Sequence, residues 1–348
     1  QFDYQSVMAG TQEDFVNFQV LTNQIYNELV KAPLDSLGNL NIDKLYFIPD
    51  KSLYGLPLDI LATEVNESAR PNYKNIKYLI NDYDISYDYS ISSIFNERII
   101  DDGNKGAQGK ILAIAPFYDE NSEGRGFKEL KNNVSEVENV SEYFDTKILK
   151  GKNATEENFI DEFVNYDILH FAMHAHIDDV NSDYSHLVFS AGQGQNQDDL
   201  MHGFEIYNLS FDVNMAVLSA CNTSKGKYEA GEGVINLSRA FSYAGAKSII
   251  TSSWEADDYV TSQIMGEFYK NLSDGLNKSQ ALRQAKMTYL NQASSDKLHP
   301  FYWGTFSLVG KDDVLNTGNS ESSYLLWIMS LLVVGLILFF VVRKRSFA

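Results

Sequence analysis

The chain has 348 residues, of which 44% are hydrophobic and 13% aromatic, so it can bury a substantial core and is not a disordered protein. Lysine and arginine number 28 against 47 aspartates and glutamates, and the net charge of −19 would repel a nucleic-acid backbone. Its single cysteine, Cys221, excludes an intrachain disulfide and any metal site built from several thiolates.

The N-terminal third begins with a helical pattern. Apolar residues recur at every third or fourth position between Asp14 and Lys31, which predicts an amphipathic helix. A charged, glycine-rich stretch, Asp101–Gly109, then separates this part from the rest of the chain. We therefore predict an N-terminal part over residues 1–100 and a main domain over residues 110–311.

Short apolar segments alternate with helical patterns in the remainder. We expect strands at Lys44–Pro49, Lys77–Ile80, Lys110–Ala115, Ile168–Ala172, His186–Ser190, Met215–Ser219 and Ser248–Ser253. We expect helices at Val134–Phe144, Thr155–Val164, Val234–Tyr243, Asp258–Asn271 and Lys278–Leu290, the last capped by Asn277. This alternation predicts an α/β fold with a mainly parallel sheet that is covered on both faces.

Two of the expected strands lead to a reactive residue, His174 after the first and Cys221 after the second. The C-terminal edge of a parallel sheet is where ligands bind, so the two side chains are expected to meet there. They lie 221 − 174 = 47 positions apart, comparable to the ~50 that separate the caspase histidine and cysteine. An imidazole beside a thiol promotes thiolate formation and protonates the leaving amine. The backbone N–H groups of Ala175 and Cys221 would hold the oxyanion.

Two other interpretations of these residues remain open. His174 can be a core histidine whose partners are satisfied, with Cys221 a packed thiol. A metal site from His170, His174, His176 and Cys221 is less attractive, because their spacing matches no familiar zinc pattern. We expect neither a metal nor a cofactor.

Further segments follow one another in a recognisable order. They are LYFIPDKSLYGLPLDIL (Leu45–Leu61), YLINDYDISYDYSISSIF (Tyr78–Phe95), ILAIAPF (Ile111–Phe117), NATEENF (Asn153–Phe159), HFAMHA (His170–Ala175), HGFEIYNLSF (His202–Phe211), the run from Leu218 to Asp258, and HPFYWGTFSLVG (His299–Gly310). This order resembles the CHAT family, a branch of the caspase-like peptidases related to separase. The resemblance implies a caspase-like three-layer sandwich and a cysteine endopeptidase with His174 and Cys221 as its catalytic dyad. The family usually has glycine where this chain has Ala175.

The resemblance also implies regulation. Caspase-like domains of this family often follow tandem helical repeats, and no such repeat is visible within these residues. An upstream region or a partner protein is therefore expected to control cleavage of a specific protein substrate. The alternative is a catalytically silent scaffold that keeps the fold and binds partner proteins.

Acidic residues follow the cysteine strand and the next strand. Glu229, Glu232, Asp257 and Asp258, with Trp254 as a wall, are candidates for a pocket that favours a basic residue before the scissile bond. The alternative is that Asp257 caps the helix beginning at Asp258 and that the glutamates are solvated.

The C-terminal segment predicts a membrane anchor. Residues 324–342 form an uninterrupted run of apolar and small residues, close to the ~20 residues that span a bilayer. A polar linker, 312–323, precedes this run and a basic tail, 343–348, follows it. The positive-inside rule places the tail in the cytoplasm and the globular part on the non-cytoplasmic side, whereas a tail anchor inserted after translation would take the opposite orientation. The first residues show no signal-peptide pattern.

Overall fold

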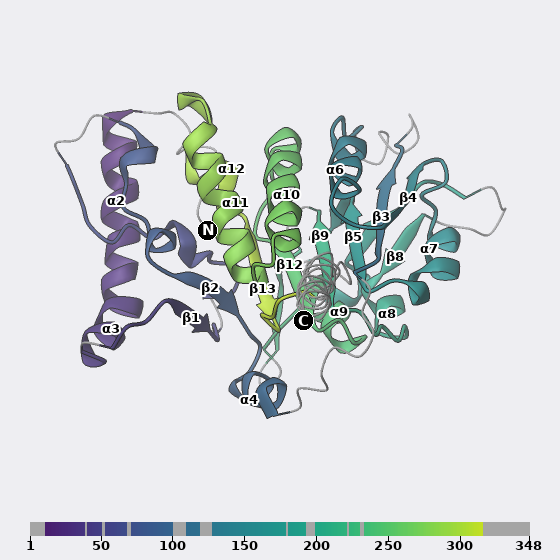
Figure 1. Cartoon of the computed structure of the whole chain (residues 1–348), viewed down its shortest axis with the longest axis horizontal. Coiled ribbons are helices and arrows are strands. Elements are labelled where there is room, and N and C mark those ends of the chain that lie inside the picture. The colour runs from purple at the N-terminus through teal and green to yellow at the C-terminus, as the bar shows by residue number, and fades with distance from the viewer. Residues whose placement is uncertain are drawn as a thin grey trace, which may run out of the picture.

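The computed structural model describes residues 11–38, 40–50, 53–67, 71–99, 109–118, 127–178, 180–192, 199–220, 223–229 and 233–315. Within these residues, an eight-stranded sheet runs in the order β1-β2-β13-β12-β9-β5-β3-β4 (Figure 1). Its strands are β1 (Lys44–Phe47), β2 (Asp84–Tyr87), β3 (Ile111–Pro116), β4 (Thr146–Gly151), β5 (Ile168–Ala172), β9 (Met215–Ser219), β12 (Ser248–Ser252) and β13 (Phe306–Gly310).

The sheet is mainly parallel, as the sequence predicts. Strands β4, β3, β5, β9 and β12 run in one direction. Strand β13 pairs antiparallel with β12, and β2 and β1 then follow the direction of β13. Strands β5, β9 and β12 are buried along their whole length, which explains why they appear in the sequence as continuous apolar runs.

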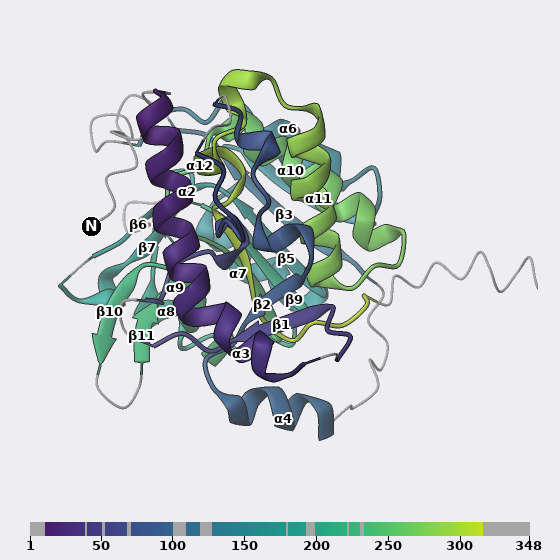
Figure 2. The ribbon, with the colours of Figure 1, turned by 90° about the vertical axis from the view of Figure 1, so that its left-hand side faces the viewer.

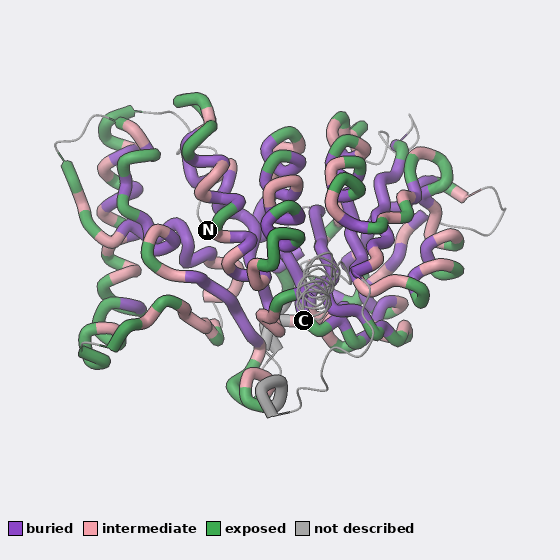
Figure 3. The backbone as a smooth tube through the Cα atoms, in the orientation of Figure 1, coloured by how far each residue is buried: buried purple, intermediate pink, exposed green. Residues whose placement is uncertain are grey.

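Helices cover both faces of the sheet, so the fold has three layers (Figures 1 and 3). Ala113 of β3 belongs to the core beneath helices α6, α10 and α11, whereas its neighbour Leu112 belongs to the opposite core. Successive side chains of a strand point to opposite faces, so β3 contributes to both cores. The first face carries α6 (Asn133–Val140), α10 (Asp258–Ser273), α11 (Lys278–Gln292) and α12 (Pro300–Trp303); the second carries α7 (Glu156–Glu162), α8 (Gly203–Ile206) and α9 (Leu237–Tyr243).

The N-terminal segment is part of the same packed body. Helix α2 (Gln12–Tyr26) continues through a π-helical turn into α3 (Ala32–Ser36) and lies at the end of the sheet formed by β1 and β2 (Figures 1 and 2). Helix α4 (Ile91–Ile99) follows β2. Ion pairs from α11 bind this segment to the main domain. Nζ of Lys286 lies 3.1 Å from Oδ1 of Asp59, and a guanidinium nitrogen of Arg283 lies 3.2 Å from Oδ1 of Asp84.

Three expected elements differ in the structure. The strand expected at Lys77–Ile80 is wrong, since a 3₁₀ turn begins at Leu79 and Tyr78 makes only an isolated bridge to Ala62. The segment from His186 forms a strand, β7 (His186–Val188), but it joins a separate antiparallel sheet with β6 (His174–His176) and β8 (Leu200–His202).

The helix expected from Val234 begins later than predicted. Residues Gly226–Glu229 and Gly233–Asn236 pair as the antiparallel strands β10 and β11, which lie apart from the main sheet (Figure 2). The Asn236 side chain accepts a hydrogen bond from the N–H of Arg239 and caps α9. An N-cap residue has extended backbone geometry, so the helix can only start after it.

The beginning of the expected polar linker is packed against the main domain. Asp312 binds Lys44 and accepts hydrogen bonds from Ser279, and Asp313 binds Lys278. Among the residues that the structure covers, no helix is long and apolar enough to cross a bilayer. The predicted transmembrane run, 324–342, and the basic tail, 343–348, lie outside the described residues.

Candidate functional site

The two strands that precede the reactive residues are neighbours. Strands β5 and β9 pair in parallel with Ala172 opposite Ser219, so they end together at the C-terminal edge of the sheet. His174 follows the end of β5 after one residue, Met173, and begins β6. Cys221 lies outside the described residues, but Ala220, the residue before it, lines the same cavity as His174. The fold therefore brings His174, which follows β5, beside Ala220 at the end of β9.

The His174 ring is held by contacts on several sides. Its Nε2 lies 2.6 Å from the backbone carbonyl oxygen of Lys128, and its backbone N–H donates to the hydroxyl of Tyr118 over 2.9 Å. The rings of Tyr118 and Phe127 pack against the imidazole at 4.7 and 5.7 Å. A carbonyl oxygen can only accept, so Nε2 must carry the proton and Nδ1 of the neutral ring keeps its lone pair.

The chain on both sides of Cys221 is fixed to the end of β12. The hydroxyl of Ser252 donates to the carbonyl oxygen of Ala220 and accepts from the N–H of Thr223. In return, the Thr223 hydroxyl accepts from the N–H of Ser252 at 2.9 Å. These bonds hold Ala220 and Thr223, the described residues on either side of that segment, at the end of β12.

The cavity lies between the ends of β5, β9 and β12 and the first turns of α6 and α10. It is open to solvent, and its empty space, including the solvent at its mouth, amounts to about 400 Å³. Its described lining consists of Leu130, Asn133, Glu136, Ala172, Met173, His174, Ser219, Ala220, Ser252, Ala256, Asp258, Thr261 and Phe306. This lining includes two carboxylates and no lysine or arginine, so it is suited to a cationic group.

The acidic residues expected around a substrate pocket are only partly assembled. Asp258 lines the cavity, and its Oδ2 accepts hydrogen bonds from the backbone and side-chain nitrogens of Asn132 at 2.7 and 3.0 Å. Asp257 instead caps α10 and pairs with Lys297 at 3.1 Å, which is the alternative that its sequence position allowed. Glu232 and the side chain of Glu229 lie outside the described residues.

Trp254 is a core residue and does not line the cavity. It is 4% exposed, its indole N–H donates to the carbonyl oxygen of Phe301, and the two rings are stacked. Ala175 lies in β6 opposite Leu187, and its expected role as an oxyanion donor stays a prediction.

The histidines that an alternative metal site would use do not converge. His170 is fully buried and hydrogen bonded to Glu136 and Tyr269, whereas His176 is exposed in β6 and its ring lies tilted against that of His186. In the described part of the chain, no three histidine, cysteine, aspartate or glutamate side chains are arranged to hold a metal ion.

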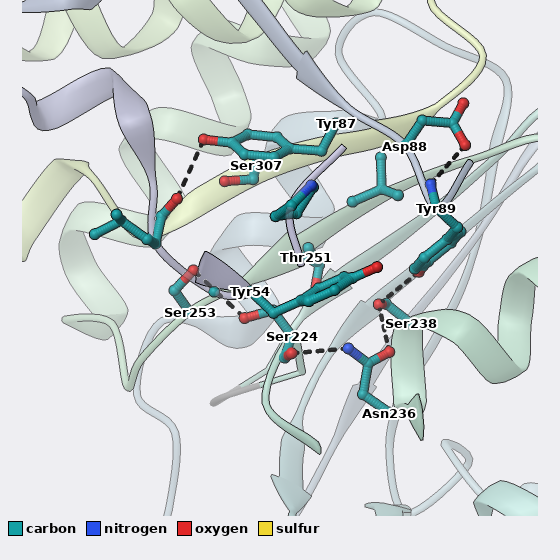
Figure 4. Close-up of a pocket in the computed structure, with 14 residues that line it drawn as sticks. Tyr54, Tyr87, Asp88, Tyr89, Ser224, Asn236, Ser238, Thr251, Ser253 and Ser307 are labelled. Carbon is teal, nitrogen blue, oxygen red and sulfur yellow. Dashed lines mark hydrogen bonds between the residues drawn. The ribbon is translucent and has the colours of Figure 1, made fainter. Parts of the chain in front are cut away.

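A second cavity lies on the other side of β12 and is shown in Figure 4; its empty space, including the solvent at its mouth, amounts to about 420 Å³. Tyrosines of the N-terminal segment meet the loop that follows Cys221 here. The hydroxyls of Tyr89 and Ser238 lie 3.0 Å apart, Ser238 donates to Asn236, and Asn236 donates to the carbonyl oxygen of Ser224 (Figure 4). This chain of hydrogen bonds connects the end of β2 to the segment after the nucleophile candidate.

Sequence reasoning missed several residues of the site. The contribution of Lys128 is a backbone carbonyl, for which no sequence signal exists. Glu136 carried a usable signal, because it stands four positions before the buried Val140 and so faces the core from its helix. The hydroxyls of Ser219, Ser252 and Thr261 are ordinary at strand ends and first helical turns, and only the fold brings them together.

The chain is similar to several known proteins. The sequence pattern of the CHAT domain matches residues 19–311. Tetratricopeptide repeat protein 28 of Homo sapiens is 34% identical over 124 residues, which are 36% of this chain and 5% of that protein. Its counterpart in Mus musculus is 31% identical over 121 residues, again 5% of that protein. The chain thus covers a small part of the length of these relatives.

Two solved structures with a similar backbone fold share little sequence identity with this chain. The Arg-specific cysteine proteinase gingipain R of Porphyromonas gingivalis matches with a TM-score of 0.48 and 12% identity over 86% of this chain and 67% of that chain. The separase–securin complex of Saccharomyces cerevisiae matches with a TM-score of 0.45 and 11% identity over 70% of this chain and 14% of that chain.

Proposed function

The chain belongs to the CHAT domain family, and from this premise we propose that it is a cysteine endopeptidase that cleaves a protein substrate through His174 and Cys221. The observation that supports this most is the shared cavity, which His174 and Ala220 line at the ends of two adjacent strands. A nucleophile directly after Ala220 would lie at the mouth of that cavity. The cavity is open to solvent, as a peptide substrate requires.

The proposed mechanism follows from how His174 is held. Because Nε2 donates to the Lys128 carbonyl, Nδ1 is the base that takes the proton of the Cys221 thiol. The thiolate attacks the carbonyl carbon of the scissile bond, and the N–H groups of Ala175 and Cys221 stabilise the oxyanion. The imidazolium then protonates the leaving amine, and water hydrolyses the thioester. The Lys128 carbonyl also stabilises the imidazolium while it exists.

We expect a basic residue before the scissile bond. Asp258 is the member of the predicted acidic group that lines the cavity, and no lysine or arginine accompanies it in the described lining. Asp257, engaged with the α10 cap and Lys297, has no part in this proposal.

Regulation through the N-terminal segment is a further part of the proposal. The hydrogen bonds from Tyr89 through Ser238 and Asn236 to Ser224 provide a physical route from β2 to the segment after Cys221. A partner or upstream region that shifts β2 would act on the nucleophile through this route.

We also propose that residues 324–342 anchor the protein in a membrane with the globular part on the non-cytoplasmic side. The apolar run and the basic residues after it support this arrangement. Protease digestion of sealed vesicles whose cytoplasmic face is inside tests this orientation. The proposed orientation leaves the globular part open to the protease, and the opposite orientation protects it.

The alternative is a catalytically silent scaffold that binds partner proteins. Ala175, in the position where the family usually has glycine, favours this alternative, because a methyl group beside the expected oxyanion narrows its approach. A scaffold would bind its partner equally well after Cys221→Ala.

Cleavage of a diverse peptide library by the full chain, in detergent, separates the two functions. We expect the parent to cleave and both Cys221→Ala and His174→Ala to be inactive. Cleavage retained in either variant refutes the dyad, and an inactive parent that binds its partner supports the scaffold.

A further inference from the structure

Behind the proposed dyad, a polar network crosses the core between the sheet and its helices. His170, on β5, is fully buried. Its Nε2 lies 3.0 Å from Oε1 of Glu136 on α6, and its Nδ1 lies 2.9 Å from the hydroxyl of Tyr269 on α10. Buried polar groups of this kind destabilise a fold unless all their partners are present.

One arrangement of protons satisfies all three groups. Burial, and secondarily the nearby Glu136, raises the pKa of Tyr269 well above its ordinary value, so the phenol keeps its proton and donates it to Nδ1. The His170 tautomer that accepts this hydrogen bond at Nδ1 carries its proton on Nε2 and donates it to Glu136. His170 and Tyr269 thereby fix the orientation of the Glu136 carboxylate, with Oε1 committed to the histidine.

Glu136 also lines the cavity that His174 and Ala220 share. Glu136 is only 2% exposed whereas His174 is partly exposed, so the carboxylate bonded to His170 lies deeper in the cavity wall than the His174 ring. The cavity thus extends from the proposed dyad at its mouth toward a carboxylate inside.

Two hydroxyls in the wall of this cavity have no partner among the described residues. The Ser219 and Thr261 side-chain oxygens are both buried without a hydrogen bond, and the residues are only 9% and 6% exposed. Unsatisfied buried hydroxyls are uncommon, and here both belong to the lining of one cavity. A ligand that brings hydrogen-bond donors would satisfy them.

We propose that Glu136 determines specificity by binding the cationic end of the lysine or arginine side chain that precedes the scissile bond. Ser219 and Thr261 accept further N–H groups of that cation, and His170 and Tyr269 are positioning residues for the carboxylate. This inference rests on the proposed peptidase function for its substrate, but the binding site itself does not require cleavage.

Binding of two matched peptides tests the proposal without catalysis. The full-length Cys221→Ala chain, in detergent, is titrated with a labelled peptide that ends in arginine amide and with the same peptide ending in citrulline, which is isosteric and uncharged. We expect the arginine peptide to bind roughly 10- to 100-fold more tightly, the effect of one charge-assisted hydrogen bond in a buried site.

Substitution of the carboxylate should remove this preference. Glu136→Gln keeps the shape of the side chain and is expected to lower the arginine-to-citrulline ratio to the small part that Asp258 contributes. Glu138→Gln is the matched control, because Glu138 lies on the same helix, half-exposed, and pairs with Lys150; it should leave the ratio unchanged. Tyr269→Phe should reduce the ratio partially, and a melting curve of each variant separates this effect from unfolding.

Each outcome decides the matter. Equal binding of both peptides by the parent, no binding of either, or a preference that Glu136→Gln leaves undiminished overturns the proposal. If the preference depends on Glu136 but the intact chain cleaves nothing, the peptidase function fails while the site stands. If the chain cleaves through its dyad after neutral residues, the function stands and this inference falls.

Discussion

His299 offers a pH test of the fold that can be worked out from its surroundings. It caps α12 by accepting, at Nδ1, a hydrogen bond of 3.1 Å from the N–H of Phe301. Its Nε2 finds no partner among the described residues, and its ring packs on those of Tyr73 and Phe18 at 4.5 and 5.7 Å. Protonation at Nδ1 would turn this acceptor into a donor facing another donor, inside an aromatic cluster.

The size of the effect follows from the two pKa values. Burial lowers the pKa of His299 from 6.5 to about 4 in the folded protein. Below pH 6.5 the unfolded chain takes up a proton that the folded chain refuses, so stability falls as the pH falls. The loss is about 1.4 kcal/mol for each pH unit and reaches about 3 kcal/mol at pH 4.

The assay is urea unfolding at several pH values between 7 and 4, compared with His299→Asn. Asparagine keeps a cap acceptor but does not titrate. The variant is expected to be less stable than the parent at pH 7, because it leaves a void, and to lose less stability on acidification. Parallel stability profiles for parent and variant would refute the reasoning.

Three further predictions concern the site and its support. Ser252→Ala removes the hydroxyl that bonds to Ala220 and Thr223 on either side of Cys221, so kcat should fall about 10-fold or more while KM changes little. Ser252→Thr should recover part of the lost kcat, and a change in KM with kcat unchanged would contradict this role of Ser252. Asp59→Ala leaves the fully buried Lys286 ammonium without its carboxylate and should lower the free energy of unfolding in urea by about 3–5 kcal/mol. Adding Lys286→Met to Asp59→Ala should restore much of this loss, and a double variant whose loss equals the sum of the two single losses would contradict the pairing. Asp257→Ala should lower stability by about 1 kcal/mol through loss of the α10 cap without changing peptide preference, whereas Asp258→Asn should weaken the preference for basic peptides; the reverse pattern would exchange their roles.

The elements predicted best from the sequence are those whose pattern reflects burial. Strands β5 and β9 begin and end where their apolar runs do, because both faces of each are covered. Helix α11 begins after Asn277, whose side chain accepts from the N–H of Gln280, as the sequence suggested. From these elements alone the mainly parallel sheet and the edge that carries His174 can be derived.

Of the small sheet of β6, β7 and β8, the sequence predicted β7 as a strand but neither of its partners. Strands β6 and β8 have only three residues each in the structure, too few for a periodicity to be visible. Two of its strand ends carry His176 and His202, polar residues that do not indicate a strand.

The candidate pocket could be predicted only in outline. Asp257 and Asp258 are adjacent and chemically alike, yet one caps a helix and the other lines the cavity, since their side chains leave the first turn of α10 in different directions. Glu136 and Thr261 come from helices far apart in the sequence, and only the packing of α6 beside α10 brings them together. Such a set is a property of the tertiary fold rather than of any local pattern.

Alkylation of the single cysteine tests the central claim most directly, because it needs neither a substrate nor an activator. Iodoacetamide added to the full chain at neutral pH reports on Cys221 alone. If His174 acts as its base, Cys221 should react faster than a free cysteine, and His174→Ala should reduce the rate to that of an ordinary thiol. A rate in the parent no higher than that of a free cysteine, unchanged by His174→Ala, would contradict the proposed dyad.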